Sequence, residues 1–148
     1  MSRHAASRVT FVLEGFVMNF SIIPASYAPI LLSVLRIATG LSFLEHGTGK
    51  ILGFPAGLPF LDKIPTPLLY FTGFMELIGG ALIVIGLFTR PVAFVLSGFM
   101  AVAFFLGHVL PNGVIFPAIN FGEAALLYCF IFLYLAAAGA GPLSVDRS

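Results

Sequence analysis

The sequence has little of two things that most catalytic or nucleic-acid-binding domains need, namely cysteine and charge. Its single cysteine, Cys129, excludes an intrachain disulfide, a Cys-x-x-Cys redox pair and a covalent c-type haem. Lysine and arginine number 7 and aspartate and glutamate 6, for a net charge of +1. No basic stripe is available to neutralise phosphates, so a nucleic-acid partner is excluded, and a strongly basic membrane-surface patch is absent as well. Any redox chemistry needs a bound cofactor or a partner.

What the sequence has in abundance is apolar side chains. Of its 148 residues, 59% are hydrophobic and only 9% are charged, and the mean hydropathy is +1.09. This composition is far more apolar than that of a soluble domain and identifies an integral membrane protein in contact with the lipid bilayer.

Apolar runs divide the chain into an N-terminal extension, residues 1–28, and a single membrane domain, residues 29–148. Two interpretations of the extension stay open. Glu14 and Asn19 interrupt its apolar run, which favours an uncleaved interfacial segment over a cleaved signal peptide. The domain is predicted to be an all-α, four-helix membrane bundle. Its spans cover about residues 29–51 and 68–88, a stretch from a first turn at Pro91 to about Leu110, and roughly residues 119–138.

Charges in the loops and near the ends of the spans predict an orientation. Arg3, Arg8, Arg90 and Arg147 fall on one side of the membrane, whereas Lys50 and Lys63 fall on the other. The excess of basic residues marks the cytoplasmic side, so both termini are expected in the cytoplasm.

Arg36 and Glu76 are charged residues inside the predicted spans, where an unpaired charge is costly. At about 1.5 Å of rise per residue, Arg36 lies about 10 Å from the cytoplasmic end of its helix and Glu76 about 18 Å from the end of its own. A long arginine side chain nearly closes that gap. The sequence therefore predicts a buried ion pair between Arg36 and Glu76.

Four further titratable residues, Glu45, His46, His108 and Glu123, fall at similar depths near the outer face, although they come from three helices. One interpretation is a shared polar pocket for a quinone or a proton path. The other is that each group snorkels to interfacial water. No Glu-x-x-His or His-x-x-x-His motif is present, so no metal site is predicted.

Aromatic residues in the fourth span leave a similar choice. Tyr128 and Tyr134 are candidates for hydrogen bonds to a quinone head group, but filling the bundle interior is the alternative. Cys129 lies on a different face from Glu123 and Tyr134, which favours a structural role for its thiol.

Taken together, the motifs resemble those of the DoxX-like family of small four-helix bacterial membrane proteins. The resemblance covers about residues 30–147. It rests on residues 35–40 (LRIATG), 43–50 (FLEHGTGK), 76–80 (ELIGG) and 86–91 (GLFTRP), with His108, Glu123 and the tail at 141–146 (GPLSVD). The long N-terminal extension and Val145, where leucine is usual, depart from the family pattern.

The resemblance implies a multi-pass protein of the bacterial inner membrane that is associated with redox systems, since relatives are linked to thiosulfate and quinone oxidation. It names no catalytic residue, and fold alone does not transmit function. Two hypotheses follow. The chain is either a subunit of a quinone- or sulfur-linked redox system, with quinone as the candidate cofactor, or a non-catalytic accessory subunit that docks a larger membrane complex. Both hypotheses call for other membrane protein subunits as partners.

Overall fold

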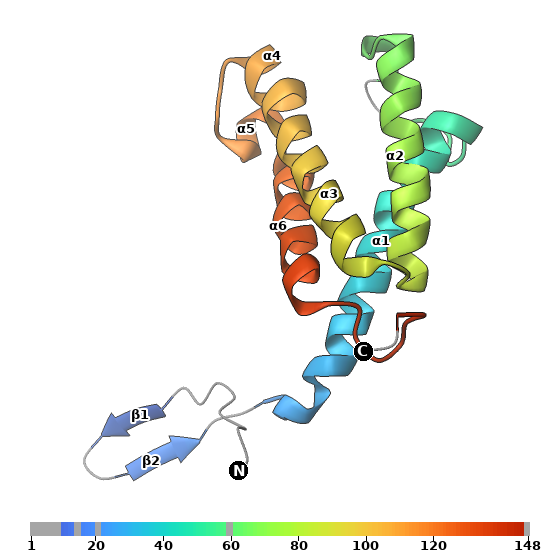
Figure 1. Cartoon of the computed structure of the whole chain (residues 1–148). Coiled ribbons are helices and arrows are strands. Elements are labelled where there is room, and N and C mark those ends of the chain that lie inside the picture. Colours follow the sequence, from blue (N-terminus) through green and yellow to red (C-terminus); the bar gives the residue numbers. More distant parts are fainter. Residues whose placement is uncertain (1–9, 14–15, 20–21, 59–60, 147–148) are drawn as a thin grey trace.

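The computed structural model describes residues 10–13, 16–19, 22–58 and 61–146 (Figure 1). Most of the described chain is helical, and a short hairpin lies near its N-terminal end. Its long helices are α1 (Ala28–Leu52), α2 (Thr66–Ile85), α3 (Thr89–Ala103) and α6 (Glu123–Ala138). The short ones are η1 (Ala25–Tyr27), η2 (Leu61–Lys63), η3 (Phe104–Val109), α4 (Leu110–Asn112) and α5 (Pro117–Asn120). The predicted all-α bundle is confirmed.

Three stretches among the described residues are long and apolar enough to cross a membrane: Ala25–Leu52, Thr66–Ile85 and Thr89–Asn112. Their bounds lie within a few residues of the predicted spans. The fourth span is not the continuous helix that we expected, because α5 ends at Asn120, Phe121 adopts a left-handed φ of 60°, and α6 then begins. The 16 residues of α6 rise about 24 Å, which is shorter than a hydrocarbon core of about 30 Å.

The third span also departs from a regular helix. After α3 the chain continues as a π-helix, η3, which carries His108, and the short α-helix α4 follows it. Such π segments often mark functional positions. Pro91 lies in the first turn of α3, as predicted, where its missing N–H costs nothing.

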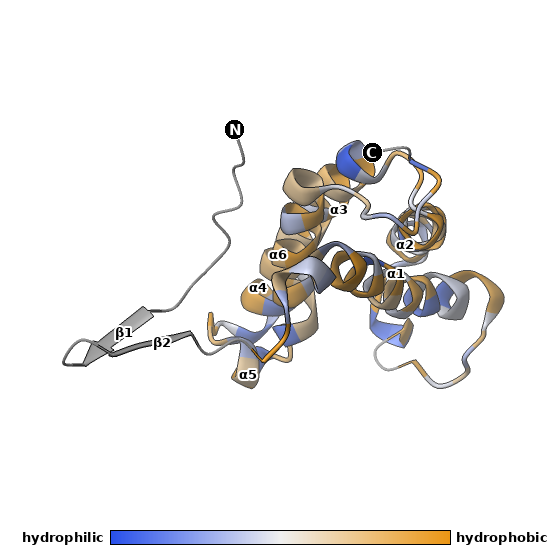
Figure 2. Ribbon diagram, turned by 90° about the horizontal axis from the view of Figure 1, so that it is seen from below, coloured by the Kyte–Doolittle hydropathy of each residue, from blue (hydrophilic) through white to orange (hydrophobic). Residues whose placement is uncertain are grey.

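The four long helices pack as two antiparallel pairs, α1 with α2 and α3 with α6, which diverge toward the end of the bundle that carries α4 (Figure 1). Side chains between the pairs form the core; Phe43, Leu96 and Phe132 are each at most 1% exposed. Hydrophobic residues dominate the long helices (Figure 2). The outward faces therefore suit a lipid environment.

Glycines set the spacing between α1 and α2. A Cβ on Gly47 would lie 2.8 Å from the carbonyl carbon of Glu76, and one on Gly80 would lie 2.9 Å from the Cα of Leu44. The two backbones therefore approach each other more closely than any larger residue permits. Close approach at small residues is typical of helix pairs in membranes.

At the opposite end from α4, charged side chains satisfy the ends of the helices. Arg90 donates to the carbonyls of Ala137 (2.6 Å) and Ala138 (3.4 Å) at the C-terminus of α6. The Asp146 carboxylate accepts from the backbone N–H of Phe88 (2.8 Å) and Thr89 (2.7 Å), where α3 begins. The Thr89 N–H holds the pKa of Asp146 below its ordinary value, so this carboxyl is ionised at neutral pH. A cation thus lies at a helix C-terminus and an anion at a helix N-terminus, the favourable arrangement for both dipoles.

The N-terminal extension contains a feature that we did not predict. Strands β1 (Thr10–Leu13) and β2 (Phe16–Asn19) pair antiparallel, with Thr10 opposite Asn19 and Leu13 opposite Phe16. The placement of this extension at the membrane interface stays a prediction. Residues Arg3, Arg8 and Arg147, used to predict the orientation, lie outside the described residues.

Candidate functional site

The buried carboxylate of Glu76 forms an ion pair inside the bundle, but its partner is Lys50. The Lys50 Nζ lies 2.6 Å from Glu76 Oε1, and the exposed fractions of the two side chains are 13% and 8%. Lys50 also donates to Thr72 Oγ1 at 3.3 Å. Close approach of α1 and α2 at Gly47 brings these side chains together. We call Lys50, Thr72 and Glu76 the lysine–glutamate cluster.

One oxygen of this cluster is left open. Glu76 Oε2 is buried and has no hydrogen-bond partner within the described part of the chain. An ionised carboxylate offers about four acceptor positions, and a buried acceptor without a partner costs about 1–3 kcal/mol. A proton on Glu76 Oε2, or a hydrogen bond donated to this oxygen by a ligand, would therefore stabilise the cluster.

A second polar group borders the cluster. His46 lies one turn before Lys50 on α1, and its ring centroid is 6.4 Å from that of Tyr128 on α6. The Tyr128 hydroxyl donates to Ser42 Oγ at 2.7 Å. Ser42, His46 and Tyr128 thus form a second polar group between α1 and α6, one turn of α1 from Lys50.

The predicted ion pair between Arg36 and Glu76 is wrong. Arg36 is fully buried, as expected, but its guanidinium donates to backbone carbonyls. These are Ile83 and Val84 at the C-terminus of α2 (2.5 and 2.6 Å), Ala140 (2.9 Å) and Leu143 in the tail. A buried cation at a helix C-terminus is favourable because the last carbonyls have no partner within the helix.

The register between α1 and α2 explains this correction. Gly40 packs against Val84 and Gly47 against Leu77, so Glu76 faces the Lys50 end of α1. Arg36 lies a turn before Gly40 and therefore beside the end of α2. Our depth estimate placed the ends of both helices at one level, whereas α1 extends beyond the end of α2.

The four residues of the predicted outer pocket are dispersed among different surroundings. Glu45 is exposed next to His46 on α1, and Glu123 is exposed as the first residue of α6. The His108 Nδ1 pairs with the carbonyl of Asn120 at 3.2 Å. Among the described residues, no hydrogen bond or ion pair joins these four side chains.

Lys50 and Thr72 are the functional candidates that our sequence reasoning missed. The signal was present, since Lys50 shares a helical face with Arg36, Gly40, His46 and Gly47. We assigned Lys50 to the loop side of the membrane because it lies near the end of its span. Its flexible side chain instead reaches inward to Glu76.

Comparisons with known proteins agree on one family. The DoxX family model matches residues 31–109. A Haemophilus influenzae protein named "Uncharacterized protein" is 43% identical over 123 residues, covering 82% of this chain and 92% of its own. "Inner membrane protein YphA" of Escherichia coli is 31% identical, covering 80% and 90%. "Putative oxidoreductase CatD" of Bacillus subtilis is 30% identical, covering 76% and 82%. No solved structure matches the chain at a significant level.

Proposed function

This chain belongs to the DoxX family of membrane proteins, and on that premise we propose that it is a membrane subunit of a redox system. Within that system, we propose that the lysine–glutamate cluster exchanges protons with a quinone head group. The name of the Bacillus subtilis relative, an oxidoreductase, supports the redox assignment. Electrons are supplied by a redox partner in the same membrane.

The observation that carries this proposal is the open oxygen of Glu76. A buried carboxylate oxygen without a hydrogen-bond partner suits the reversible uptake of a proton, because Oε2 has lone pairs that no donor occupies. A bound quinone supplies a two-electron, two-proton redox couple. The residues at hand fit such a head group: the third N–H of the Lys50 ammonium would donate to a quinone carbonyl oxygen, and Glu76 would hold a proton at Oε2.

Proton exchange with water needs a route out of the membrane interior. Lys50 keeps 13% of its side chain exposed, compared with 8% for Glu76, so exchange passes along the Lys50 side. We further propose that Glu45, His46, His108 and Glu123 lie along the route to the outer face. These residues come from the second half of α1, from η3 and from the start of α6, the segments toward the end of the bundle where the two helix pairs diverge (Figure 1).

Exchanging the Glu76 carboxyl for an amide tests the proposal. Glu76→Gln keeps the shape of the side chain and its acceptor for Lys50, but holds no transferable proton. Wild-type protein in detergent is expected to retain decyl-ubiquinone through gel filtration in quinone-free detergent buffer, as measured by solvent extraction of the protein peak. The variant should retain at least about tenfold less, a difference of about 1.4 kcal/mol. Its unfolding temperature should change by only a few degrees.

The matched control is Asp62→Asn, which makes the same chemical change at an exposed carboxyl in the loop between α1 and α2. This control should retain the quinone fully. If wild-type protein never retains it, or if Glu76→Gln retains as much as wild type, the proton-exchange proposal is wrong. The non-catalytic accessory subunit would then be the better account.

We also propose that both termini lie in the cytoplasm. The backbone N–H of Asp146 donates a hydrogen bond to the carbonyl of Gly86 at 2.8 Å, which puts the C-terminal tail at the same end of the bundle as Arg90. This placement agrees with the expected clustering of basic residues. In a Cys129→Ala background, a cysteine at Leu61 should react with an impermeant thiol reagent added to spheroplasts, and one at the exposed Phe88 should not. The reverse labelling pattern would invert the orientation.

A further inference from the structure

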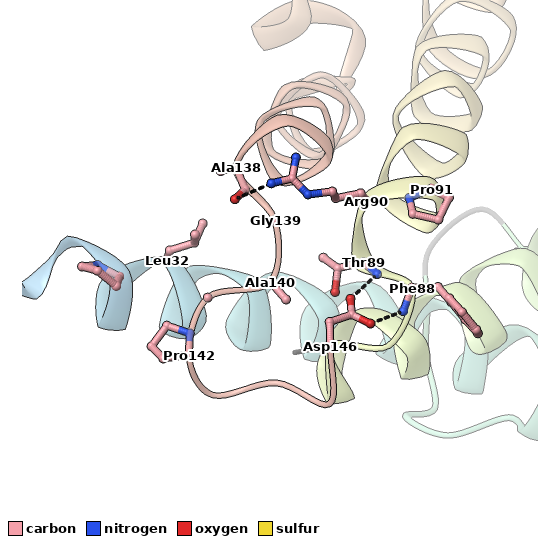
Figure 3. A pocket seen from close by; sticks show the side chains of 12 residues that line it. Leu32, Phe88, Thr89, Arg90, Pro91, Ala138, Gly139, Ala140, Pro142 and Asp146 are labelled. Carbon is pink, nitrogen blue, oxygen red and sulfur yellow. Dashed lines mark hydrogen bonds between the residues drawn. The ribbon is translucent and has the colours of Figure 1, made fainter. Parts of the chain in front are cut away.

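A cavity of about 600 Å³ opens at the end of the bundle opposite to α4 (Figure 3). Three segments form it: the start of α1, the turn into α3, and the tail that follows α6. Pro29, Leu32, Phe88 and Pro142 supply apolar walls. The quinone proposal uses none of these residues.

Two opposite charges line this cavity. In Figure 3 the guanidinium of Arg90 lies on one side and the carboxylate of Asp146 on the other. Both groups hold helix ends, yet both keep unused hydrogen-bonding capacity. Within the described residues, Arg90 donates from its two terminal nitrogens, which leaves its Nε–H, and Asp146 accepts two N–H groups out of about four positions.

The charge pattern selects among ligands. An anionic group that approaches Arg90 also approaches Asp146 and is repelled by its carboxylate. A simple cation that approaches Asp146 is likewise repelled by the guanidinium of Arg90. A ligand with one phosphate and one ammonium satisfies both residues. Because the cavity lies where α2 ends and α3 begins, at the limit of the apolar spans, it falls at the level of lipid head groups.

We propose that this cavity binds the head group of a zwitterionic phospholipid that carries a primary ammonium. The phosphate pairs with Arg90 and the ammonium donates to Asp146, while the apolar walls at Leu32 and Phe88 contact the glycerol and the first acyl carbons. A phosphoethanolamine lipid has this chemistry. A phosphocholine lipid has the same charges, but its quaternary nitrogen has no N–H to donate.

Binding of such a lipid ties together segments from both helix pairs. The cavity contains residues of α1 from one pair and of α3 and the post-α6 tail from the other. A ligand that binds only this folded arrangement raises the unfolding temperature by mass action. The bound lipid thus stabilises the contact between the two helix pairs at the end of the bundle opposite to α4.

The test compares full-length protein in vesicles of phosphocholine lipid alone with vesicles containing equal parts of phosphoethanolamine, or of phosphoglycerol, lipid. Native mass spectrometry of protein extracted from the equal mixtures should show about tenfold preference for phosphoethanolamine over phosphocholine, the contribution of a charged hydrogen bond. The unfolding temperature should rise only with phosphoethanolamine lipid. Soluble phosphoethanolamine, added to phosphocholine vesicles, tests whether the head group suffices without acyl chains.

Asp146→Asn removes the charge but keeps a side-chain acceptor, and it should abolish the preference. Asp62→Asn, remote from the cavity, should keep it. Equal retention of all three lipids by wild-type protein, preference for phosphoglycerol lipid, or an undiminished preference in Asp146→Asn would each overturn the proposal. Because the wild-type comparison needs no variant, the proposal is tested even if Asp146→Asn does not fold.

Discussion

Replacing Arg36 by alanine is expected to abolish folded protein. Arg36 is fully buried and donates to backbone carbonyls of four residues, Ile83, Val84, Ala140 and Leu143. The Ile83 carbonyl keeps the Gly86 N–H, but the carbonyls of Val84, Ala140 and Leu143 lose their donor, at about 1–3 kcal/mol for each that stays buried, and the lost side chain leaves a cavity besides. The sum approaches the entire stability of a typical domain, about 5–15 kcal/mol.

The measurement is the yield of monodisperse protein in detergent by size-exclusion chromatography. Arg90→Ala is the matched control, since Arg90 also donates to helix carbonyls but from an exposed position. Its loss should cost only about 0.3–1 kcal/mol and leave the yield close to wild type. Similar yields for Arg36→Ala and Arg90→Ala would show that the buried guanidinium does not hold the bundle together.

Gly47→Ala should produce the second large effect. The new Cβ would lie 2.8 Å from the carbonyl carbon of Glu76, inside ordinary contact distance, and it meets backbone that no rotamer change can move. The helices α1 and α2 must separate, which costs about 1–3 kcal/mol and loosens the ion pair between Lys50 and Glu76. Thermal unfolding in detergent and quinone retention should therefore fall together.

Gly98→Ala supplies the control, because a Cβ on this helical glycine of α3 meets nothing within 4 Å. Alanine is the better helix former by about 1 kcal/mol, so this variant should be as stable as wild type or slightly more stable. If Gly47→Ala unfolds at the same temperature as Gly98→Ala, the close contact between α1 and α2 is not what stabilises the pair.

Most of the bundle was predictable from the sequence because hydrocarbon imposes a simple rule on length and polarity. Apolar runs located the first three spans, and prolines and glycines located their ends. The break at Phe121 escaped prediction, since a non-glycine residue at a φ of 60° leaves no mark in composition. The pairing of β1 with β2 also went unpredicted, because short apolar segments do not distinguish strand from helix.

The candidate site was predictable only in part. Burial of Arg36 and Glu76 followed from the cost of placing charge in lipid, and both are buried. Their partners depend on how far α1 slides along α2, which Gly40 and Gly47 determine through contacts with Val84 and Leu77. A register of this kind is a tertiary property that counting residues from the ends of spans does not supply.

The central claim is that Glu76 exchanges a proton with a bound quinone, and infrared difference spectroscopy tests it most directly. Wild-type protein, reconstituted with decyl-ubiquinone, is reduced electrochemically while the carboxyl region of the spectrum is recorded. With enough decyl-ubiquinone added to load every variant, we predict a carboxyl band that changes on reduction, persists in Asp62→Asn and is absent from Glu76→Gln. The same band in Glu76→Gln, or no carboxyl change in wild-type protein with quinone bound, would contradict the assignment of Glu76 as the proton-exchanging group.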